Sequence, residues 1–263
     1  MLTVTLASLS GGQGKTTAAL FLGKMLAANG IKVLMIDADP QASLTFYLGH
    51  DVKSDEFTLL EVITGEAKPK DAIYQIQPNN YLMPADNGLN AAQEHIVRLG
   101  AGAAVLRKRL KPISEDFDVC IIDAPPQGSQ LSLASIAAAD QLLIPAEAGS
   151  KGVNSVLRTL DVVDDLQSLE IFSGQILGII PFRDKWFGRT QSGCSKSAIE
   201  GIKKIADNLT VWPSIRESES FRKSLDQGKL PQEFNSEITY TFEKIIETLE
   251  EKCLIKTLTL SVG

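Results

Sequence analysis

The sequence predicts an α/β fold, in which helices cover both faces of a doubly wound, mostly parallel sheet. Two segments, 32–37 and 118–123, are apolar inside and end in an aspartate. Such continuous apolar runs are typical of parallel strands that are buried on both faces. They alternate with segments of helical periodicity, which is the order expected of a doubly wound sheet. No linker or internal repeat interrupts this order, so we expect one domain over residues 1–263.

The first turn of the predicted fold is a glycine-rich loop between an apolar run at 2–7 and a helical pattern at 18–28. Glycines let the backbone aim its N–H groups at phosphate oxygens, and the following helix presents its positive end to the same anion. In such loops the lysine reaches the phosphates, and the hydroxyl that follows it binds Mg²⁺. The residues expected to bind a nucleotide here are Gly11, Gly12, Gln13, Gly14, Lys15, Thr16 and Thr17.

The loop departs from the standard phosphate-loop pattern G-x-x-x-x-G-K-[ST]. Leu9 stands where that pattern has its first glycine, so the loop has the shorter form GGxGKT. The alternative interpretation is a glycine turn that only joins a strand to a helix. We favour phosphate binding, because Lys15 and Thr16 stand in register between a strand and a helix.

Aspartates follow two of the predicted strands. Asp37 and Asp39 come at the end of the run 32–37, and Asp123 ends the run 118–123. Ligands of doubly wound sheets bind beyond the carboxyl ends of the strands, and an aspartate there can hold Mg²⁺, usually through water. The alternative for the first pair is a plain Asp-Pro turn. Beside the glycine loop, we favour a functional role.

The remaining chain supplies further elements but less chemistry. Residues 44–80 are expected to be helical and loop-like. The last long helix should dock onto the core, because its apolar residues recur at helical spacing. The other expected elements are a short strand at 81–85, helices at 89–98 and 103–110, a strand at 141–145, a helix ending near Leu166, a strand at 174–180 and the last helix at 236–252.

Composition narrows the class of protein. Three cysteines without paired spacing indicate a reducing compartment, and two distant histidines offer no metal cluster. The chain begins in a strand, which leaves no room for a signal peptide, and no apolar run approaches a membrane span. We therefore expect a cytoplasmic protein without a membrane partner. The net charge of −6 argues against nucleic-acid binding over the whole surface, although a local basic face is compatible with it.

Taken together, the motifs resemble those of the ParA/MinD superfamily, the ATPases with a deviant Walker A loop. The resemblance covers nearly the whole chain and rests on SGGQGKTT (10–17), IDADPQ (36–41), DVCIIDAPPQG (118–128) and LLIPAEAGSKG (142–152). It implies a P-loop NTPase fold and a homodimer that holds ATP and Mg²⁺ between its two subunits. Hydrolysis of the ATP would separate the subunits.

The resemblance also assigns roles by motif position. Lys15 would contact the phosphates, Asp39 would position the attacking water, and Asp123 would be the Walker B acid. Hydrolysis would then depend on positioning and charge neutralisation, with little covalent chemistry. The metal site would comprise Thr16, Asp37, Asp39 and Asp123. Adenine contacts are expected from Phe182, Arg183 and Pro213, where the chain departs from the asparagine-containing pattern of the family.

Ser10 is a departure with a chemical consequence. In the family a lysine at this position crosses the dimer interface to the partner's phosphates, and a serine cannot supply that charge. Because negative charge spreads over the transferred group in the transition state, a substitute cation is expected. Lys151 is the candidate, on a Gly-Ser-Lys-Gly loop just past a strand end. The alternative is a solvated loop lysine.

The serine resembles one branch of the superfamily, the cyanobacterial ATPases that space carboxysomes over the nucleoid. This branch implies an ATP-bound dimer that binds DNA without sequence preference and an adaptor on the cargo that stimulates hydrolysis. Basic residues gather between 185 and 223, with Trp186 and Phe187 among them, although ordinary solvated helix faces would look the same. The candidate DNA face comprises Lys185, Arg189, Lys203, Lys204, Arg216, Arg222 and Lys223.

Three other functions remain open. A plasmid or chromosome partition ATPase would use the same mechanism. A MinD-like ATPase would need a basic amphipathic C-terminal helix, and the tail 253–260 carries few cations. A nitrogenase-reductase relative would need cluster-binding cysteines, and Cys120, Cys194 and Cys253 match no such motif.

Overall fold

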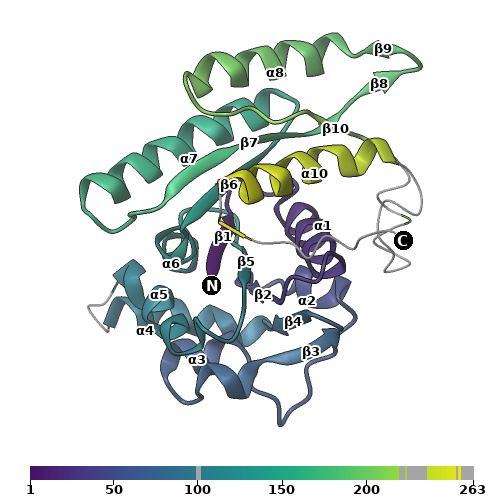
Figure 1. Ribbon diagram of the computed structural model, residues 1–263. Helices are drawn as coiled ribbons and strands as arrows, with labels where there is room; N and C mark the ends of the chain where they lie inside the picture. The colour runs from purple at the N-terminus through teal and green to yellow at the C-terminus, as the bar shows by residue number, and fades with distance from the viewer. Residues whose placement is uncertain (99–101, 219–222, 224–235, 253, 256–263) are drawn as a thin grey trace.

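A computed structural model describes residues 1–98, 102–218, 223, 236–252 and 254–255 (Figure 1). Its centre is an eight-stranded sheet with the strand order β10-β7-β6-β1-β5-β2-β4-β3. Every neighbouring pair in this sheet is parallel except β3 and β4, which are antiparallel. The predicted fold class is therefore confirmed. The strands are β1 (Leu2–Leu6), β2 (Val33–Asp37), β3 (Tyr74–Gln77), β4 (Asn80–Met83), β5 (Val119–Asp123), β6 (Gln141–Glu147), β7 (Gln175–Asp184) and β10 (Ile215–Arg216).

Helices cover both faces of the sheet (Figure 1). One face carries α1 (Lys15–Ala28), α2 (Ser43–Tyr47) and α10 (Ser236–Glu251). The apolar side chains of α10 pack there as expected, with the rings of Phe242 and Phe21 6.2 Å apart. The opposite face carries α3 (Leu59–Thr64), α4 (Ala91–Arg98), α5 (Val105–Leu110), α6 (Gln130–Ala138), α7 (Ser150–Ser168) and α8 (Gly193–Ala206).

The central strands are apolar throughout because both of their faces are buried. In β2, Val33 and Met35 enter the cluster under α1, whereas Leu34 and Ile36 enter the cluster under α3 to α6. Alternate residues of a strand point to opposite faces, so two covered faces leave no position for a polar side chain until the strand ends. The aspartates that end β2 and β5 are therefore the only polar side chains in otherwise apolar strands.

Several elements differ from the sequence-based expectations. The stretch 44–80 contains β3, an edge strand whose side chains alternate between partly buried and exposed, so it lacks the apolar run of a central strand. The strand expected at 174–180 continues to Asp184, and the first helix begins at Lys15. Within the described part of the chain, none of the helices combines the length and the apolar character that a membrane crossing requires.

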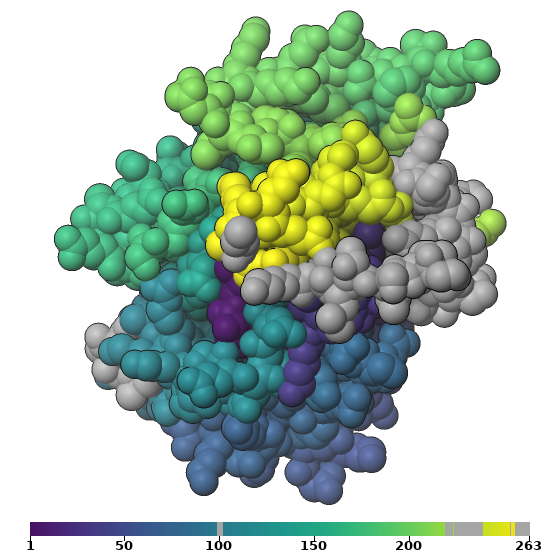
Figure 2. Space-filling view, in the orientation of Figure 1, coloured from purple at the N-terminus to yellow at the C-terminus, as the bar shows by residue number. Residues whose placement is uncertain are grey.

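At the β10 edge, the chain leaves the sheet and forms a small hairpin. Its strands are β8 (Trp186–Phe187) and β9 (Thr190–Gln191), which pair antiparallel. Helix α8 follows directly, and the Ser195 hydroxyl accepts a hydrogen bond from the Lys185 N–H at 3.1 Å. Figure 2 shows α8 and the hairpin (green) at one end of the molecule, beyond α10 (yellow).

Candidate active site

The phosphate loop ends at Gly14, where only glycine fits. Gly14 caps α1 with a φ of 93°, a conformation that side-chain-bearing residues rarely adopt. A Cβ atom on it would also lie 2.5 Å from the ring of Phe182. No side chain caps the N–H groups that open α1, and its first turn carries no acid. These N–H groups are the donors that a helix start offers to an anion.

Lys15 lies in the first turn of α1 and is almost fully buried. Its ammonium donates a hydrogen bond to the Ser10 carbonyl oxygen at 3.2 Å. Burial lowers the pKa of Lys15, the negative charges of Asp123 and Asp39 oppose this change, and the charge of Lys151 adds to it. The structure thus brings together four charged groups that are far apart in the sequence.

Asp37 and Asp123 end neighbouring parallel strands and are paired in register. Burial is the main cause that raises the pKa of both carboxyl groups. The charge of Asp39 also raises the pKa of Asp37, which reaches about 6, and the charge of Asp37 also raises the pKa of Asp123. The Thr16 hydroxyl and the Lys15 ammonium lower the pKa of Asp123 in part. Apart from the Thr16 hydroxyl, the Asp123 carboxylate has no hydrogen-bond partner among the described residues. A buried carboxylate with so few partners is costly unless a cation meets it.

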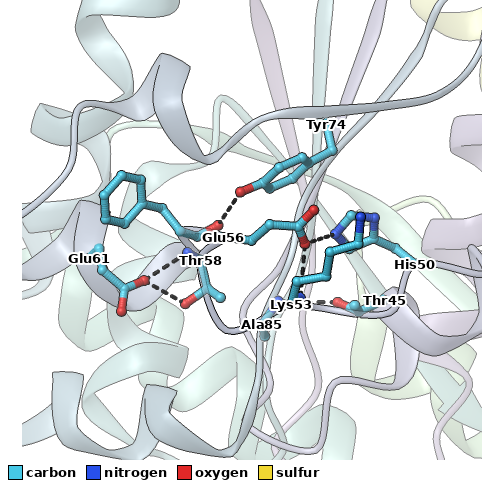
Figure 3. A network of polar contacts seen from close by, with 9 residues as sticks. Thr45, His50, Lys53, Glu56, Thr58, Glu61, Tyr74 and Ala85 are labelled. Carbon is cyan, nitrogen blue, oxygen red and sulfur yellow. Dashed lines mark hydrogen bonds and ion pairs between the residues drawn. The ribbon is translucent and has the colours of Figure 1, made fainter.

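Asp37 differs from Asp123 because its two oxygens are already engaged. Oδ2 accepts hydrogen bonds from the Thr45 N–H at 2.8 Å and the Thr45 hydroxyl at 2.9 Å. Oδ1 accepts one from the Asp39 N–H at 3.2 Å. The Thr45 hydroxyl also accepts a hydrogen bond from the Ala85 N–H, a contact that Figure 3 shows. Asp37 therefore ties the end of β2 to α2 and to the end of β4.

A wider polar network holds the segment after α2 (Figure 3). The Glu56 carboxylate meets His50 Nε2 at 3.0 Å and accepts a hydrogen bond from the Lys53 N–H. Thr58 and Glu61 form a capping box at the start of α3. The network extends the anchorage of Asp37 through a segment in which the sequence showed no readable chemistry.

Asp39 is half-buried and also shapes a turn. Its Oδ1 accepts a hydrogen bond from the Gln41 N–H at 2.9 Å, and its carbonyl oxygen accepts one from the Ala42 N–H at 2.8 Å. The Asp-Pro turn weighed as the alternative is therefore present. It also holds the carboxylate near Lys15, whose pKa responds to its charge. The same turn is therefore compatible with both interpretations, the plain Asp-Pro turn and a functional role of Asp39.

Lys151 does not lie on a loop, and this corrects the sequence-based expectation. Gly149 caps α7, which begins at Ser150, so Lys151 stands in the first turn of the helix. Its ammonium donates a hydrogen bond to the Gly11 carbonyl oxygen at 2.8 Å. The positive end of a helix dipole disfavours a cation such as the Lys151 ammonium. An anion bound at this end of α7 would offset that repulsion, which makes a role in anion binding the better explanation of a lysine at this position.

Side chains of α7 and the backbone of β6 hold the phosphate loop in place. The Ser8 and Ser155 hydroxyls are 2.9 Å apart, and the Leu9 N–H donates to the Thr159 hydroxyl at 3.2 Å. The buried side-chain amide of Gln13 accepts a hydrogen bond from the Glu147 N–H at 2.9 Å, so Gln13 can offer a ligand its backbone rather than its side chain. No local pattern in the sequence indicates these three partners, because they lie more than 130 positions away.

Two of the three residues expected at the adenine lie close to the loop. Phe182 packs on Gly14, and an Arg183 nitrogen would be 4.0 Å from a Cβ atom built on Gly12. Pro213 is exposed, and its carbonyl oxygen accepts a hydrogen bond from the Thr241 hydroxyl at 3.0 Å. Contact of these residues with adenine stays a prediction.

The candidate DNA face divides into two groups of exposed cations. Lys185, Arg189 and Arg216 surround the β8–β9 hairpin, whereas Lys203 and Lys204 lie in the last turn of α8. A helix of this length separates its two ends by about 20 Å. Lys223 is also exposed, and Arg222 lies outside the described residues. In the part of the chain that the structure describes, no three His, Cys, Asp or Glu side chains form a metal-binding group.

Fold and loop together define a class, the P-loop nucleoside triphosphatases. A family model described as an AAA domain matches residues 1–171. "Maintenance of carboxysome distribution protein A" of Synechococcus elongatus is 54% identical over 95% of this chain and 99% of its own. The protein of the same name from Gloeothece citriformis is 53% identical over 97% and 100%.

A solved structure agrees with these relatives. It is a single-residue variant of McdA from Cyanothece in complex with ATP, with a TM-score of 0.94 and 52% identity over 98% of both chains. The chain belongs to the ParA/MinD superfamily of ATPases, among the relatives of the carboxysome distribution proteins. The resemblance drawn from the motifs is thereby confirmed.

Proposed function

We propose that this ATPase positions carboxysomes by ATP-dependent dimerisation and sequence-independent binding to nucleoid DNA. The observation that carries this proposal is the 54% identity to a carboxysome distribution protein over 99% of that protein's length. The identity extends over nearly the full length of both chains and is not confined to the phosphate loop. We therefore extend the proposal to the whole cycle of ATP binding, dimerisation, DNA binding and hydrolysis, and to a cytoplasmic, nucleoid-associated location.

The phosphates of ATP fit the hydrogen-bond donors that the loop presents. The N–H groups from Gly11 to Thr17 and the Lys15 ammonium are donors gathered at the uncapped start of α1. Bound phosphates would replace the Ser10 carbonyl oxygen as the partner of Lys15. The same anion would offset the burial of that ammonium. Phe182, Arg183 and Pro213 would then line the path from the phosphates towards the base.

Mg²⁺ fits beside this loop because the Asp123 carboxylate is fully buried and, among the described residues, only the Thr16 hydroxyl and the Lys15 ammonium offset its charge. Thr16 would hold the ion directly, and Asp123 would hold it through water, because Mg²⁺ keeps several of its waters. Asp39 would complete the set, while Asp37 supports it from behind through its own hydrogen bonds. The ion supplies charge neutralisation to the phosphates. Asp39 would orient the attacking water towards the terminal phosphate.

Lys151 would complete the site across the dimer. In this structure the Gly11 carbonyl oxygen holds its ammonium at the rim of the loop of its own subunit. When two loops face each other around ATP, the same side chain can turn to the partner's phosphates. It would supply the charge that Ser10 cannot, and it would thereby make dimerisation depend on ATP.

Within the candidate DNA face, the basic edge formed by Lys185, Arg189 and Arg216 around the hairpin would bind DNA once the dimer has formed. Each subunit carries a modest cluster of cations, and two linked clusters bind far more tightly than one. An adaptor on the carboxysome would stimulate hydrolysis, and the separated subunits would then leave the DNA. Contacts of this kind go to phosphates and carry no sequence information.

A binding experiment tests the proposal directly. Purified protein is titrated against two unrelated DNA duplexes with ATP and Mg²⁺, with ADP and Mg²⁺, or without nucleotide. We expect equal affinity for both duplexes with ATP, and weakening by at least tenfold with ADP, as roughly expected when a bivalent complex becomes monovalent. Equal binding in all three conditions would refute ATP gating.

The cargo requires a test in the cell. Deletion of the gene should cluster the carboxysomes, which microscopy of a labelled shell protein would show. Evenly spaced carboxysomes together with the loss of a plasmid or chromosome would instead establish the partition function.

A further inference from the structure

The β8–β9 hairpin presents an aromatic ring to the outside of the molecule. Phe187 is 75% exposed and pairs with Thr190 across the two-residue turn Gly188–Arg189. Gly188 has a φ of 60°, as the tight turns of two-residue hairpins require. Single apolar residues are common on protein surfaces, so exposure alone would mean little. Two features of its surroundings, a rigid hairpin and neighbouring cations, indicate that this ring binds a partner.

A buried carboxylate makes the hairpin rigid. Asp184 is fully buried and accepts hydrogen bonds from Trp186 Nε1 at 2.9 Å, from Gln191 Nε2 at 2.9 Å and from the Ser214 hydroxyl at 2.7 Å. These donors come from both strands of the hairpin and from the segment before β10. A short two-stranded hairpin is marginal by itself, so this hub fixes its direction. The exposed ring is therefore held in place before any partner arrives.

Three cations lie on the hairpin or next to it. The Arg216 guanidinium stacks on the Trp186 ring, 4.0 Å from its centroid, and Arg189 stands in the turn beside Phe187. Lys185 precedes the hairpin and lies 3.9 Å from the Glu217 carboxylate, with both side chains about half exposed. An apolar group beside cations complements a polyanion that can also offer apolar surface. DNA has this combination where a base step opens, because its charged backbone then flanks the apolar faces of the two bases.

We propose that Phe187 contacts the bases of bound DNA as an apolar wedge, while Arg189 and Arg216 bind the flanking phosphates. Proteins that bind DNA without sequence preference often add such a wedge to their phosphate contacts. The wedge adds affinity without reading the sequence, because every base step offers an apolar face. This inference rests on the proposed DNA binding and adds a contact that is not electrostatic.

Salt dependence separates the two kinds of contact. DNA affinity with ATP is measured across a series of salt concentrations for the wild type, Phe187→Ala, Phe187→Trp and Arg189→Ala. Phosphate contacts release counterions, so they set the slope of log affinity against log salt, whereas an apolar contact leaves that slope unchanged. Leu169→Ala is the matched control, because Leu169 is an apolar side chain of similar exposure (66%) at the end of α7.

We expect Phe187→Ala to weaken binding by roughly five- to a hundredfold at every salt concentration with the wild-type slope, as the loss of one stacked base would. Phe187→Trp should retain most of the affinity, and Arg189→Ala should make the slope shallower by about one. Wild-type affinity in Phe187→Ala, with weakened Arg189→Ala, would overturn the wedge and leave the DNA-binding function standing.

Two further outcomes distinguish the alternatives. Absence of ATP-dependent DNA binding in every protein, the wild type included, would overturn the proposed function and the wedge with it. The ATP-dependent dimer is also measured for each variant by sedimentation. If Phe187→Ala loses the dimer while Leu169→Ala keeps it, the ring serves the subunit interface, and the wedge is wrong.

Discussion

The ammonium of Lys151 donates a hydrogen bond to the Gly11 carbonyl oxygen at 2.8 Å. The two residues are 140 positions apart, yet one belongs to the phosphate loop and the other to the first turn of α7. Ser155 and Thr159, farther along α7, hold the residues that precede the loop. The helix that carries the candidate cation is thus fixed to the loop that it would serve.

Gly14 should tolerate no side chain. Gly14→Ala combines a φ of 93° with a Cβ atom 2.5 Å from the Phe182 ring. We expect it to lower the free energy of unfolding by about 1–3 kcal/mol, as backbone strain of this kind does. Gly11→Ala is the control, because a Cβ atom there meets no atom within 4 Å. Denaturant unfolding without nucleotide measures both, and equal stability of the two variants would contradict the packing described here.

Thr45 should stabilise the charged form of Asp37. Thr45→Val removes a hydroxyl that donates to the Asp37 carboxylate and accepts from the Ala85 N–H. We expect a loss of about 1–3 kcal/mol in the free energy of unfolding at pH 8. Thr45→Ser keeps both hydrogen bonds and should recover most of the loss.

The same variant should show a pH dependence of definite sign. Loss of a donor to the charged carboxylate raises the pKa of Asp37 above its folded value of about 6. A raised pKa favours proton uptake by the folded protein, so the destabilisation should be full at pH 8, shrink as the pH falls towards 6, and be smallest below 6, where both proteins carry the protonated group. A loss that grows towards pH 5 would contradict this assignment.

Asp123 should lower the free energy of unfolding of the protein and yet be required for ATP turnover. Asp123→Asn removes a fully buried charge that the Thr16 hydroxyl and the Lys15 ammonium offset only in part, so in the absence of Mg²⁺ and ATP we expect the free energy of unfolding to rise by about 1–2 kcal/mol. ATP turnover should fall by a factor on the order of a hundred, because the ion loses a carboxylate that would hold it. A variant that is less stable and fully active would show that Asp123 is purely structural.

The basic edge should act through its charges. Simultaneous Arg189→Glu and Arg216→Glu should reduce ATP-dependent DNA binding at moderate salt by a factor on the order of a hundred, because phosphates would meet like charges. Simultaneous Lys108→Glu and Lys111→Glu is the matched control of equal charge change, since both lysines are exposed, on α5 and directly after it, far from the hairpin in Figure 1. Equal effects of the two changes would show that net charge, rather than this edge, controls binding.

The sequence predicted the centre of the fold but not its edges. β2 and β5 are apolar throughout because both faces are covered, and that pattern is local. β3 is an exposed edge strand with alternating polar residues, so its sequence reads equally well as a loop. Lys151 was placed on a loop because Gly149 and Gly152 suggested one. Gly149 is instead a helix cap, and Gly152 lets α7 pack against the Glu147 backbone.

The same distinction applies to the site. Motif spacing located Lys15, Asp37, Asp39 and Asp123, because strand ends and loops meet at one edge of a parallel sheet. It could not reveal that both oxygens of Asp37 already accept hydrogen bonds, from Thr45 and from the Asp39 N–H. Nor could it reveal that Asp184 fixes the hairpin. Such contacts depend on packing between segments that no local pattern connects.

The central claim is that Lys151 supplies the charge that Ser10 lacks. The most direct measurement is the fraction of dimer at saturating ATP and Mg²⁺, determined by analytical ultracentrifugation for the wild type, Lys151→Ala and Arg158→Ala. Arg158, an exposed cation farther along α7, is the matched control. We expect the wild type and Arg158→Ala to dimerise with ATP and Lys151→Ala to remain monomeric. A Lys151→Ala protein that dimerises as the wild type does would contradict the claim.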